Sequence, residues 1–311
     1  MVRLYCDRRM LDHVTPSRHP ERPERLATVL RHLDRTGFAQ SIPWGTVRPA
    51  TDDELTRVHT PGYLAALRAM EAQGPGLVEP DTWMGPGSLL AARLAAGAAI
   101  EAVAGVVAGT DPTALCLVRP PGHHARPDEP MGFCFFDSIA VAAADAVGRL
   151  ELGRVLIVDW DVHHGNGTQE IFEADPRVGF LSIHRYPFYP GSGAADETGV
   201  GPGLGTTRNV PLPLGTSRAS YRSAFRSALE EMADRMRPEL VLISAGFDAH
   251  AEDPIGSLGL EIEDFEILTR DVLDVAEVHA GGRVVSILEG GYNLSILAGC
   301  VEAHLRTLAG S

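Results

Sequence analysis

Two carboxylates and an imidazole alternate at the end of one strongly apolar segment. The segment runs from Val155 to Val158, and Asp159, Asp161 and His163 follow it. A short aliphatic run of this kind predicts a strand that is buried on both faces. Residues two apart in an extended chain point to the same side, so the three polar side chains should project together. This combination of ligand types suits a divalent metal ion.

Further polar side chains follow other predicted strands. The adjacent histidines His123 and His124 titrate near neutral pH, which suits proton transfer. Asp248 follows a predicted strand over residues 239–245 and could complete the metal site. His250 is a further candidate ligand, but a structural or surface role is favoured for it.

Tyr292 follows two glycines, Gly290 and Gly291, after another predicted strand. Glycines let the backbone approach a ligand closely, and the phenol could then donate to a developing oxyanion. Taken alone, each motif also fits a structural role, such as a helix cap or a surface histidine. Because a parallel sheet brings the carboxyl ends of its strands to one edge, all the motifs together predict one site.

Strands and helices are predicted to alternate along most of the chain. This order is typical of a mostly parallel sheet with helices on both faces. The predicted strands are 2–5, 114–118, 154–160, 178–183, 239–245 and 283–288. The predicted helices are one that ends near Leu33, and 52–70, 88–108, 138–149, 168–174, 217–236, 262–279 and 293–309. Residues 75–87 and 184–216 are predicted as Gly- and Pro-rich loops, and no repeat or linker divides the single domain predicted over 1–311.

Composition excludes several classes of function. The formal net charge is −14, so a nucleic-acid partner, which needs a basic surface, is not expected. The four cysteines are scattered without a C-x-x-C pair, which indicates neither a disulfide framework nor a thiolate zinc site.

The apolar stretch 89–107 carries Arg93 and Glu101 and is interpreted as a buried helix. The first residues lack the apolar region of a signal peptide, so we expect a cytoplasmic enzyme with no membrane partner.

The motifs closely resemble those of the zinc-dependent histone deacetylases. They are G-H-H-A at 122–125, D-W-D-V-H-H-G-N-G at 159–167, A-G-F-D at 245–248 and E-G-G-Y at 289–292. The resemblance extends from H-P-E-R-P-E-R at 19–25 to the final helix. It is nearest to class II enzymes and bacterial deacetylase-like amidohydrolases, including acetylpolyamine amidohydrolases, because of Trp160, Asn166 and Glu289.

This resemblance implies the α/β arginase/deacetylase fold, a mostly parallel sheet of about eight strands between helices. It implies Zn²⁺, with Fe²⁺ or Co²⁺ as alternatives, held by Asp161, His163 and Asp248. The implied catalytic residues are His124 as general base and acid, His123 as its electrostatic partner held by Asp159, Asn166 as the residue that orients His124, and Tyr292 as the donor to the acyl carbonyl.

The resemblance also implies a substrate channel, an acetate exit and potassium sites. The channel residues would be Gly132, Phe133, Tyr189, Gly290 and Gly291, with Ile255 near the mouth. Arg22 would border an inner cavity through which acetate leaves. One structural K⁺ would lie near Asp159, Asp161, His163, Ser182 and Ile183, and a second around Phe172, Asp175, Val178 and Thr206.

The implied activity is hydrolysis of an acylated amine, and two other functions stay open. An arginase-like ureohydrolase binds two Mn²⁺ and needs Asp-x-His-x-Asp, but Gly165 stands at the last position. A non-catalytic acyl-lysine-binding module would not need Tyr292 and both histidines. The aliphatic Ile255 ranks acetyl-lysine substrates first and acetylpolyamines a close second. An acylated small molecule from a biosynthetic pathway is a further candidate. An oligomer could narrow the entrance to the channel.

Overall fold

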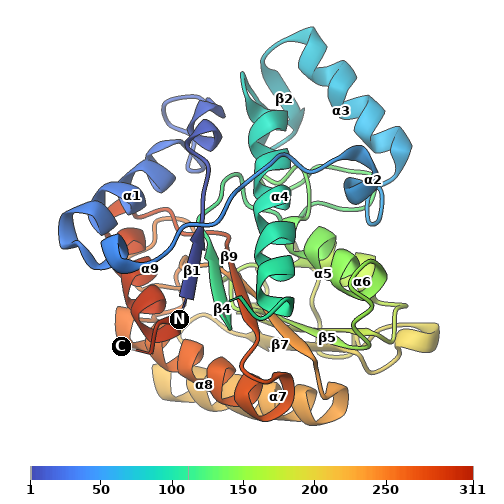
Figure 1. Ribbon diagram of the computed structural model, residues 1–311, viewed down its shortest axis with the longest axis vertical. Coiled ribbons are helices and arrows are strands. Elements are labelled where there is room, and N and C mark those ends of the chain that lie inside the picture. Colours follow the sequence, from blue (N-terminus) through green and yellow to red (C-terminus); the bar gives the residue numbers. More distant parts are fainter. Residues whose placement is uncertain (1, 111, 311) are drawn as a thin grey trace.

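A sheet of seven parallel strands organises the protein (Figure 1). The computed structural model describes residues 2–110 and 112–310. Across the sheet, the strands are β1 (Val2–Tyr5), β4 (Thr113–Cys116), β9 (Val284–Leu288), β8 (Leu240–Ala245), β5 (Val155–Asp159), β6 (Val178–Arg185) and β7 (Thr207–Leu212). All neighbouring pairs are parallel, as the alternation of strands and helices predicts. The described part of the chain thus has seven strands in this sheet, where about eight were expected.

Helices cover both faces of this sheet (Figure 1). One layer contains α4 (Ser88–Val107), α5 (Ser138–Gly148) and α6 (Asn166–Phe172). The other contains α1 (Glu24–Thr36), α9 (Leu294–Leu308), α8 (Ile262–Ala280) and α7 (Arg218–Met236). Because α1 packs on α9, the two ends of the chain belong to the same domain.

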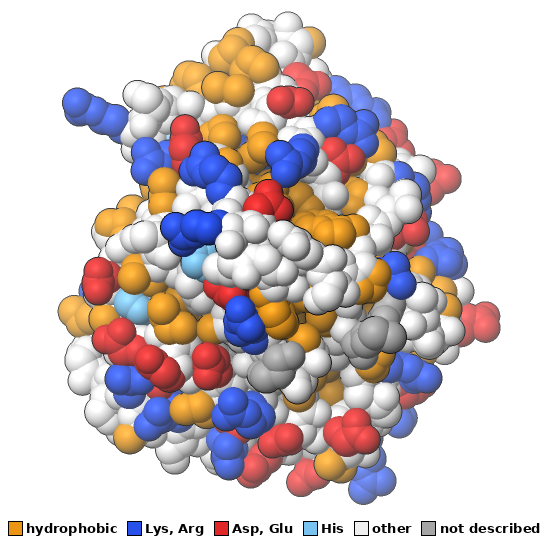
Figure 2. Space-filling view, turned by 60° about the vertical axis from the view of Figure 1, so that its left-hand side comes forward, with side chains coloured by type: hydrophobic (Ala, Val, Ile, Leu, Met, Phe, Trp, Pro, Cys, Tyr) orange, Lys and Arg blue, Asp and Glu red, His pale blue; other side chains and the backbone are white. Residues whose placement is uncertain are grey.

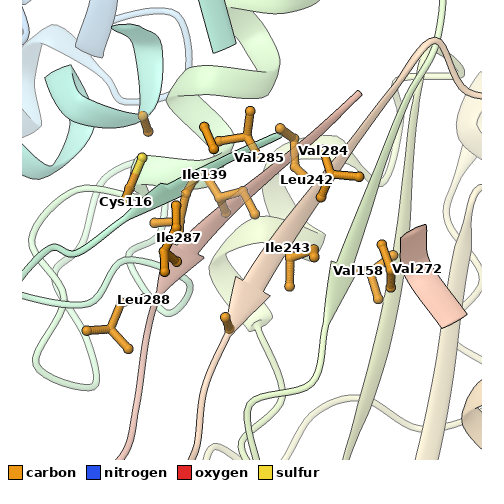
Figure 3. Packing of buried hydrophobic residues seen from close by; sticks show 14 of the residues in the cluster. Cys116, Ile139, Val158, Leu242, Ile243, Val272, Val284, Val285, Ile287 and Leu288 are labelled. Carbon is orange, nitrogen blue, oxygen red and sulfur yellow. The ribbon is translucent and has the colours of Figure 1, made fainter. Parts of the chain in front are cut away.

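The core lies between the sheet and its two helical layers. Every residue of β4, β5, β8 and β9 is buried, which explains their nearly continuous aliphatic sequences. Figure 3 shows Ile139 of α5 beside residues of β9 and β8, and Val272 of α8 beside Val158 of β5. The strands are therefore fixed from both faces, and their carboxyl ends are held on rigid supports.

The apolar helix α4 is part of this core. It is the one helix in the described part of the chain with the length and hydropathy of a membrane span, and 67% of its most apolar window is buried inside the protein. Neighbouring backbone packs closely on it: a Cβ on Gly97 would lie 1.7 Å from the carbonyl oxygen of Arg48. This burial agrees with its prediction as a core helix.

The predicted helix over 52–70 is divided in two. Helix α2 covers Asp52–Leu55, and α3 covers Pro61–Gln73. Pro61 starts α3, and the side chain of Thr60 caps it by accepting from the backbone of Tyr63 at 3.2 Å. Proline favours the first turn of a helix and disfavours helical geometry in the residue before it, so the chain breaks here.

Both predicted irregular loops contain strands. Residues 75–87 form an antiparallel hairpin of β2 (Gly76–Glu79) and β3 (Thr82–Met84). Residues 184–216 contain the end of β6 and the whole of β7. Pro211 concealed β7 in the sequence, but β7 is an edge strand and proline is tolerated there.

Charges of both signs are interspersed on the surface. Figure 2 shows arginine and acidic side chains scattered among apolar and uncharged ones over one face. Several form exposed pairs, such as Arg126 with Glu170 and Arg208 with Glu231. Each exposed pair contributes only ~0–1 kcal/mol, so the fold depends on its core and not on these contacts.

Candidate active site

Four loops meet at the carboxyl edge of the sheet because the strands before them are neighbours. Strands β4, β9, β8 and β5 lie side by side. They lead into residues 119–124, 289–293, 246–250 and 160–167, respectively. Open parallel sheets place their sites beyond the carboxyl ends of strands, and these loops carry the polar motifs.

Asp161, His163 and Asp248 form a compact group of metal-binding side chains. Their candidate ligand atoms all lie within 4.8 Å of one another, and all three residues are buried. His163 Nδ1 lies 3.0 Å from Asp161 Oδ1 and 3.2 Å from Asp248 Oδ2. This combination of one imidazole and two carboxylates suits Zn²⁺ or another divalent first-row ion.

Two features of this group fit a bound cation. Asp248 Oδ2 is buried and has no hydrogen-bond partner among the described residues, although it lies 3.2 Å from His163 Nδ1. Buried polar atoms without a partner are rare, so this oxygen is available as a ligand. A Cβ on Gly290 would lie 2.2 Å from Asp248 Oδ2, and one on Gly246 would lie 2.1 Å from Asp161 Oδ2. Both glycines therefore keep the space around the carboxylates open.

Backbone amides hold the two carboxylates in position. Val162 N–H donates to Asp248 Oδ1 at 2.9 Å, and Gly290 N–H donates to Asp161 Oδ2 at 2.8 Å. Burial and the nearby Asp161 raise the pKa of Asp248 to about 7. Two crowded, buried carboxylates repel each other, and a cation between them would remove that repulsion.

His123 and His124 lie next to each other with ring centroids 4.0 Å apart. His123 Nδ1 donates to Asp159 Oδ2 at 2.9 Å, and His124 Nδ1 donates to Asn166 Oδ1 at 2.7 Å. These bonds place the ring proton on Nδ1, because both oxygens act as acceptors. In neutral His124 the Nε2 atom is therefore free to accept a proton.

The two histidines differ in charge. Burial lowers the pKa of His124 well below its usual value, and the neighbouring His123 and His163 lower it further. Burial also acts against a charge on His123, but the carboxylates of Asp159 and Asp161 raise the pKa of His123 well above its usual value. These opposite shifts favour a charge on His123 and a neutral His124 at neutral pH.

Glu289 supports the histidine loop in a way that the sequence motif alone did not show. It is fully buried, and its Oε2 accepts from the backbone N–H of Gly122 at 2.7 Å and of His123 at 3.3 Å. Its Oε1 accepts from Ser244 Oγ at 3.1 Å. Burial raises the pKa of Glu289 to about 7. The side chain joins the loop after β4, the end of β8 and the loop after β9. Its signals in the sequence were an acid at the end of a buried strand and its place in the E-G-G-Y motif.

Tyr292 borders the site and is held from two sides. Its side chain is buried, and its backbone N–H donates to Asp253 Oδ2 at 2.7 Å. The guanidinium of Arg25 lies 4.9 Å from the centre of the Tyr292 ring, and its Nε donates to the carbonyl of Gly291 at 2.7 Å. The arginine beside this loop is therefore Arg25, whereas Arg22 is half-buried just before α1, and its place at an acetate exit stays a prediction. Position 25 lies on the buried face of α1, which turns it inward.

A cavity of about 200 Å³ leads to these side chains. Its lining residues are Asp81, His124, Gly132, Phe133, His163, Phe188, Tyr189, Ile255 and Tyr292. The lining includes four of the predicted channel residues, namely Gly132, Phe133, Tyr189 and Ile255. Of the other two, Gly290 donates to Asp161, and Gly291 accepts from Arg25. Phe188 was missed, although the pair Phe188-Tyr189 in a loop was a signal; its ring stacks on His163 at 5.2 Å and 16°.

The mouth of this cavity is mostly apolar. Ile255 is 39% exposed there. The nearby Asp253 is buried, and its Oδ1 accepts from the backbone N–H of Ile255 at 2.9 Å and of Gly256 at 3.0 Å. Because both oxygens of Asp253 bind backbone amides, this acid orders the mouth and is not a free counter-charge. Asp81 is the acidic residue in the cavity lining.

The residues predicted to bind potassium lie in two places. Asp159 is opposite Ser182 in the pairing of β5 with β6, and Ile183 follows on β6. The second set lies where α6 leads into β6 and just before β7: Phe172, Asp175, Val178 and Thr206. Their carbonyls serve backbone hydrogen bonds in part, as in the donation from Phe180 N–H to Thr206 O at 2.8 Å. Potassium binding itself stays a prediction.

His250 lies outside the metal-binding group. It is buried, its Nδ1 accepts from the backbone N–H of Glu252 at 3.0 Å, and its Nε2 lies 3.4 Å from Glu261 Oε2. These contacts fit the structural role that was favoured for it.

Comparisons with known proteins agree with this geometry. The family model described as the histone deacetylase domain matches residues 19–308. The chain is 41% identical over 293 residues to a histone deacetylase-like amidohydrolase of Pseudomonas aeruginosa, covering 94% of this chain and 77% of that protein. It is 41% identical over 302 residues to the polyamine deacetylase HDAC10 of Homo sapiens, covering 93% of this chain and 44% of that protein. A crystal structure of the HDA15 HD domain superposes with a TM-score of 0.93 and 39% identity, covering 100% of this chain and 88% of that chain.

Proposed function

Because the chain belongs to the histone deacetylase family, we propose that it is a metal-dependent hydrolase that removes acetyl or other short acyl groups from acylated amines. One observation carries this proposal: His163, of the buried metal-binding group, lines the same cavity as His124 and Tyr292. A metal ligand, a proton acceptor and a hydroxyl donor at one cavity are the parts that amide hydrolysis needs.

We assign the metal to Asp161, His163 and Asp248, and we propose Zn²⁺ with Fe²⁺ or Co²⁺ as alternatives. When bound, such an ion polarises the acyl carbonyl and lowers the pKa of a water molecule, which allows hydrolysis near neutral pH. The two K⁺ sites, a cytoplasmic location and an oligomer that narrows the entrance stay predictions.

His124 would move the proton. Its Nδ1 donates to Asn166, so Nε2 can take a proton from the attacking water and later deliver it to the leaving amine nitrogen. The charged His123 beside it opposes protonation of His124 before the attack, since two adjacent imidazolium groups repel each other. Asp159 holds His123 in place through the bond at 2.9 Å.

Tyr292 would stabilise the negative charge that develops on the acyl oxygen. Burial raises the pKa of Tyr292 well above its usual value, so the hydroxyl keeps its proton and can donate it as a hydrogen bond. Such a bond strengthens as charge builds on the oxygen in the transition state.

We expect Tyr292→Phe to lower kcat by roughly 10²–10³-fold, the usual cost of one oxyanion donor. KM should change much less, because the lost bond is weak in the ground state. Steady-state kinetics with metal content measured in parallel checks this expectation. A change confined to KM would contradict the role of the hydroxyl.

A turnover panel tests the proposed function directly. The purified protein is assayed with acetyl-lysine peptides, acetylputrescine, acetylspermidine and longer acyl-lysines, and acetate or another acid is measured as product. Release from at least one acylated amine, lost on chelation and restored by Zn²⁺, supports the proposal. A metal-loaded protein that hydrolyses none of them, yet binds acyl-lysine, would be a binding module instead.

Within this class, we rank acetyl-lysine substrates ahead of acetylpolyamines. The apolar walls formed by Phe133 and Phe188 suit the methylene stem of either substrate. At the mouth, Ile255 offers no counter-charge to a distal ammonium, and Asp253 is occupied by backbone amides. The chain matches relatives named as histone deacetylases and one named as a polyamine deacetylase, so these names do not distinguish the two substrate classes.

Ile255→Glu is expected to shift the ratio of kcat/KM towards acetylspermidine relative to an acetyl-lysine peptide. A carboxylate at the mouth would attract the distal ammonium that the peptide lacks. Ile255→Gln is the matched control, since it adds a similar polar side chain without charge. A wild type that already prefers acetylspermidine by more than about tenfold, with no change in Ile255→Glu, would overturn the ranking and the placement of Ile255.

A further inference from the structure

A fully buried carboxylate, that of Glu21, binds two buried arginines behind the Tyr292 loop. Arg119 donates to it in a forked arrangement, Nε to Oε1 at 2.9 Å and Nη2 to Oε2 at 2.8 Å. Arg25 Nη1 lies 3.5 Å from Oε1, and His13 Nε2 lies 3.3 Å from Oε2. Glu21 and Arg119 are 0% exposed, and Arg25 is 1% exposed. None of the assignments made above gives Glu21 a role.

Arg25 connects this carboxylate to the Tyr292 loop. It donates through Nε to the carbonyl of Gly291 at 2.7 Å and through Nη2 to the carbonyl of Glu289. Its guanidinium also lies 4.9 Å from the centre of the Tyr292 ring. One side chain thus holds the backbone before Tyr292 and lies over its ring.

The opposite end of the network reaches the histidine loop. Arg119 directly follows the extension of β4, four positions before His123. Its Nη1 donates to the carbonyls of Met10 at 2.8 Å and His13 at 2.7 Å, so its own position is fixed. Through Arg119 and Arg25, Glu21 therefore connects the loop that carries the two histidines with the loop that carries Tyr292.

Two guanidiniums this close together would repel each other without the carboxylate between them. Burial alone would raise the pKa of Glu21, but Arg119 chiefly holds that pKa well below its usual range, so the group is ionised at neutral pH. The forked pair with Arg119 also fixes the orientation of the Glu21 carboxylate, which a contact with a single point charge would not do. If the carboxylate is removed, Arg25 loses its contact with Glu21, and only its bonds to the carbonyls of Gly291 and Glu289 then hold it at the Tyr292 ring.

We propose that Glu21 is a positioning residue for Tyr292, acting through Arg25 to fix the tyrosine ring and the backbone that precedes it. The role rests on the proposed deacetylase function, because Tyr292 must donate to an acyl oxygen for its position to matter. A hydroxyl displaced by about 1 Å can cost up to roughly 10²-fold in rate. Loss of the Glu21 carboxylate is therefore expected to lower kcat at least tenfold, with KM much less affected.

The test compares Glu21→Gln with Asp145→Asn. Asp145 is an equally buried carboxylate with two arginine partners, Arg57 and Arg149, which belong to none of the four site loops. General loss of stability should affect both variants. A loss of kcat confined to Glu21→Gln, with full metal content, supports positioning. Wild-type turnover measured in the same assay shows separately whether the proposed function holds.

The double variant with Tyr292→Phe tests whether Glu21 acts through the tyrosine hydroxyl. If Glu21 acts through the tyrosine hydroxyl, Glu21→Gln should lower kcat far less in the Tyr292→Phe background than in wild type. Unchanged kcat in the single variant, or a loss that adds in full to that of Tyr292→Phe, would overturn the proposal. If Glu21→Gln does not fold, Glu21→Asp replaces it, since aspartate keeps the charge but is too short to bind both arginines as the wild type does. The same two results, its effect on kcat alone and in the Tyr292→Phe background, then decide.

Discussion

Asp248→Ala is expected to lose bound metal and, with it, all measurable deacetylation. Asp248 Oδ2 is a buried oxygen without a hydrogen-bond partner among the described residues, and it lies 3.2 Å from His163 Nδ1. Residues that merely orient a metal ligand typically contribute roughly 10–100-fold to metal affinity. Loss of a ligand itself should cost more, and no other described side chain of this group can replace it.

Metal content after exhaustive dialysis, measured beside turnover with added Zn²⁺, checks this expectation. Asp264→Asn is the matched control, because Asp264 is as deeply buried but is paired with Arg218 and Arg222. A full metal complement in Asp248→Ala would show that the ligand assignment is wrong. Two Mn²⁺ per wild-type chain would instead favour a ureohydrolase. The structure leaves little space at position 165 for the aspartate that a ureohydrolase needs there, because a Cβ on Gly165 would lie 2.2 Å from Asp159 Oδ2.

The second large effect is expected for His124→Ala, which should lower kcat by roughly 10²–10⁴-fold, the usual contribution of a general acid–base group. His123→Ala should cost less at neutral pH. The first change removes the free Nε2 beside the cavity, whereas the second removes a charged neighbour held by Asp159.

Kinetics of both variants with equal metal loading distinguish the two roles. Both variants lose one of two adjacent, buried rings that each donate through Nδ1, so differences in size and burial do not explain unequal losses. Nearly equal losses with metal retained, or a larger loss for His123→Ala, would mean that the two roles are confused.

The sequence determined the parts of the site that lie within a few residues of one strand end. Asp159, Asp161 and His163 alternate after an aliphatic run, and local geometry alone projects them to one side. Aliphatic segments separated by helices also predicted a parallel sheet, since such strands must be covered on both faces. The order β4–β9–β8–β5 then brings the four loops together, as the shared edge of a parallel sheet requires.

Errors of prediction occurred where tertiary contacts override local signals. The edge position of β7 permits Pro211 within a strand, and Thr60 with Pro61 starts a new helix inside an apparently continuous pattern. Arg25 lies on the inward face of α1 and Arg22 does not, although both arginines belong to the same short motif. Sequence spacing could not distinguish them, because the choice depends on how α1 packs against α9 and the Tyr292 loop.

Only the tertiary structure decided which polar side chains support the catalytic ones. Glu21 meets Arg119 across 98 residues of chain, and Glu289 meets Gly122 across 167. Asp253, which stands two positions before Ile255 in the sequence, is buried and accepts from the backbone of Tyr292 and Ile255. A buried strand and the ligands at its end leave a periodic pattern in the sequence, so they could be predicted. Hydrogen bonds between distant segments leave no such pattern, so the supporting side chains became visible only in the tertiary structure.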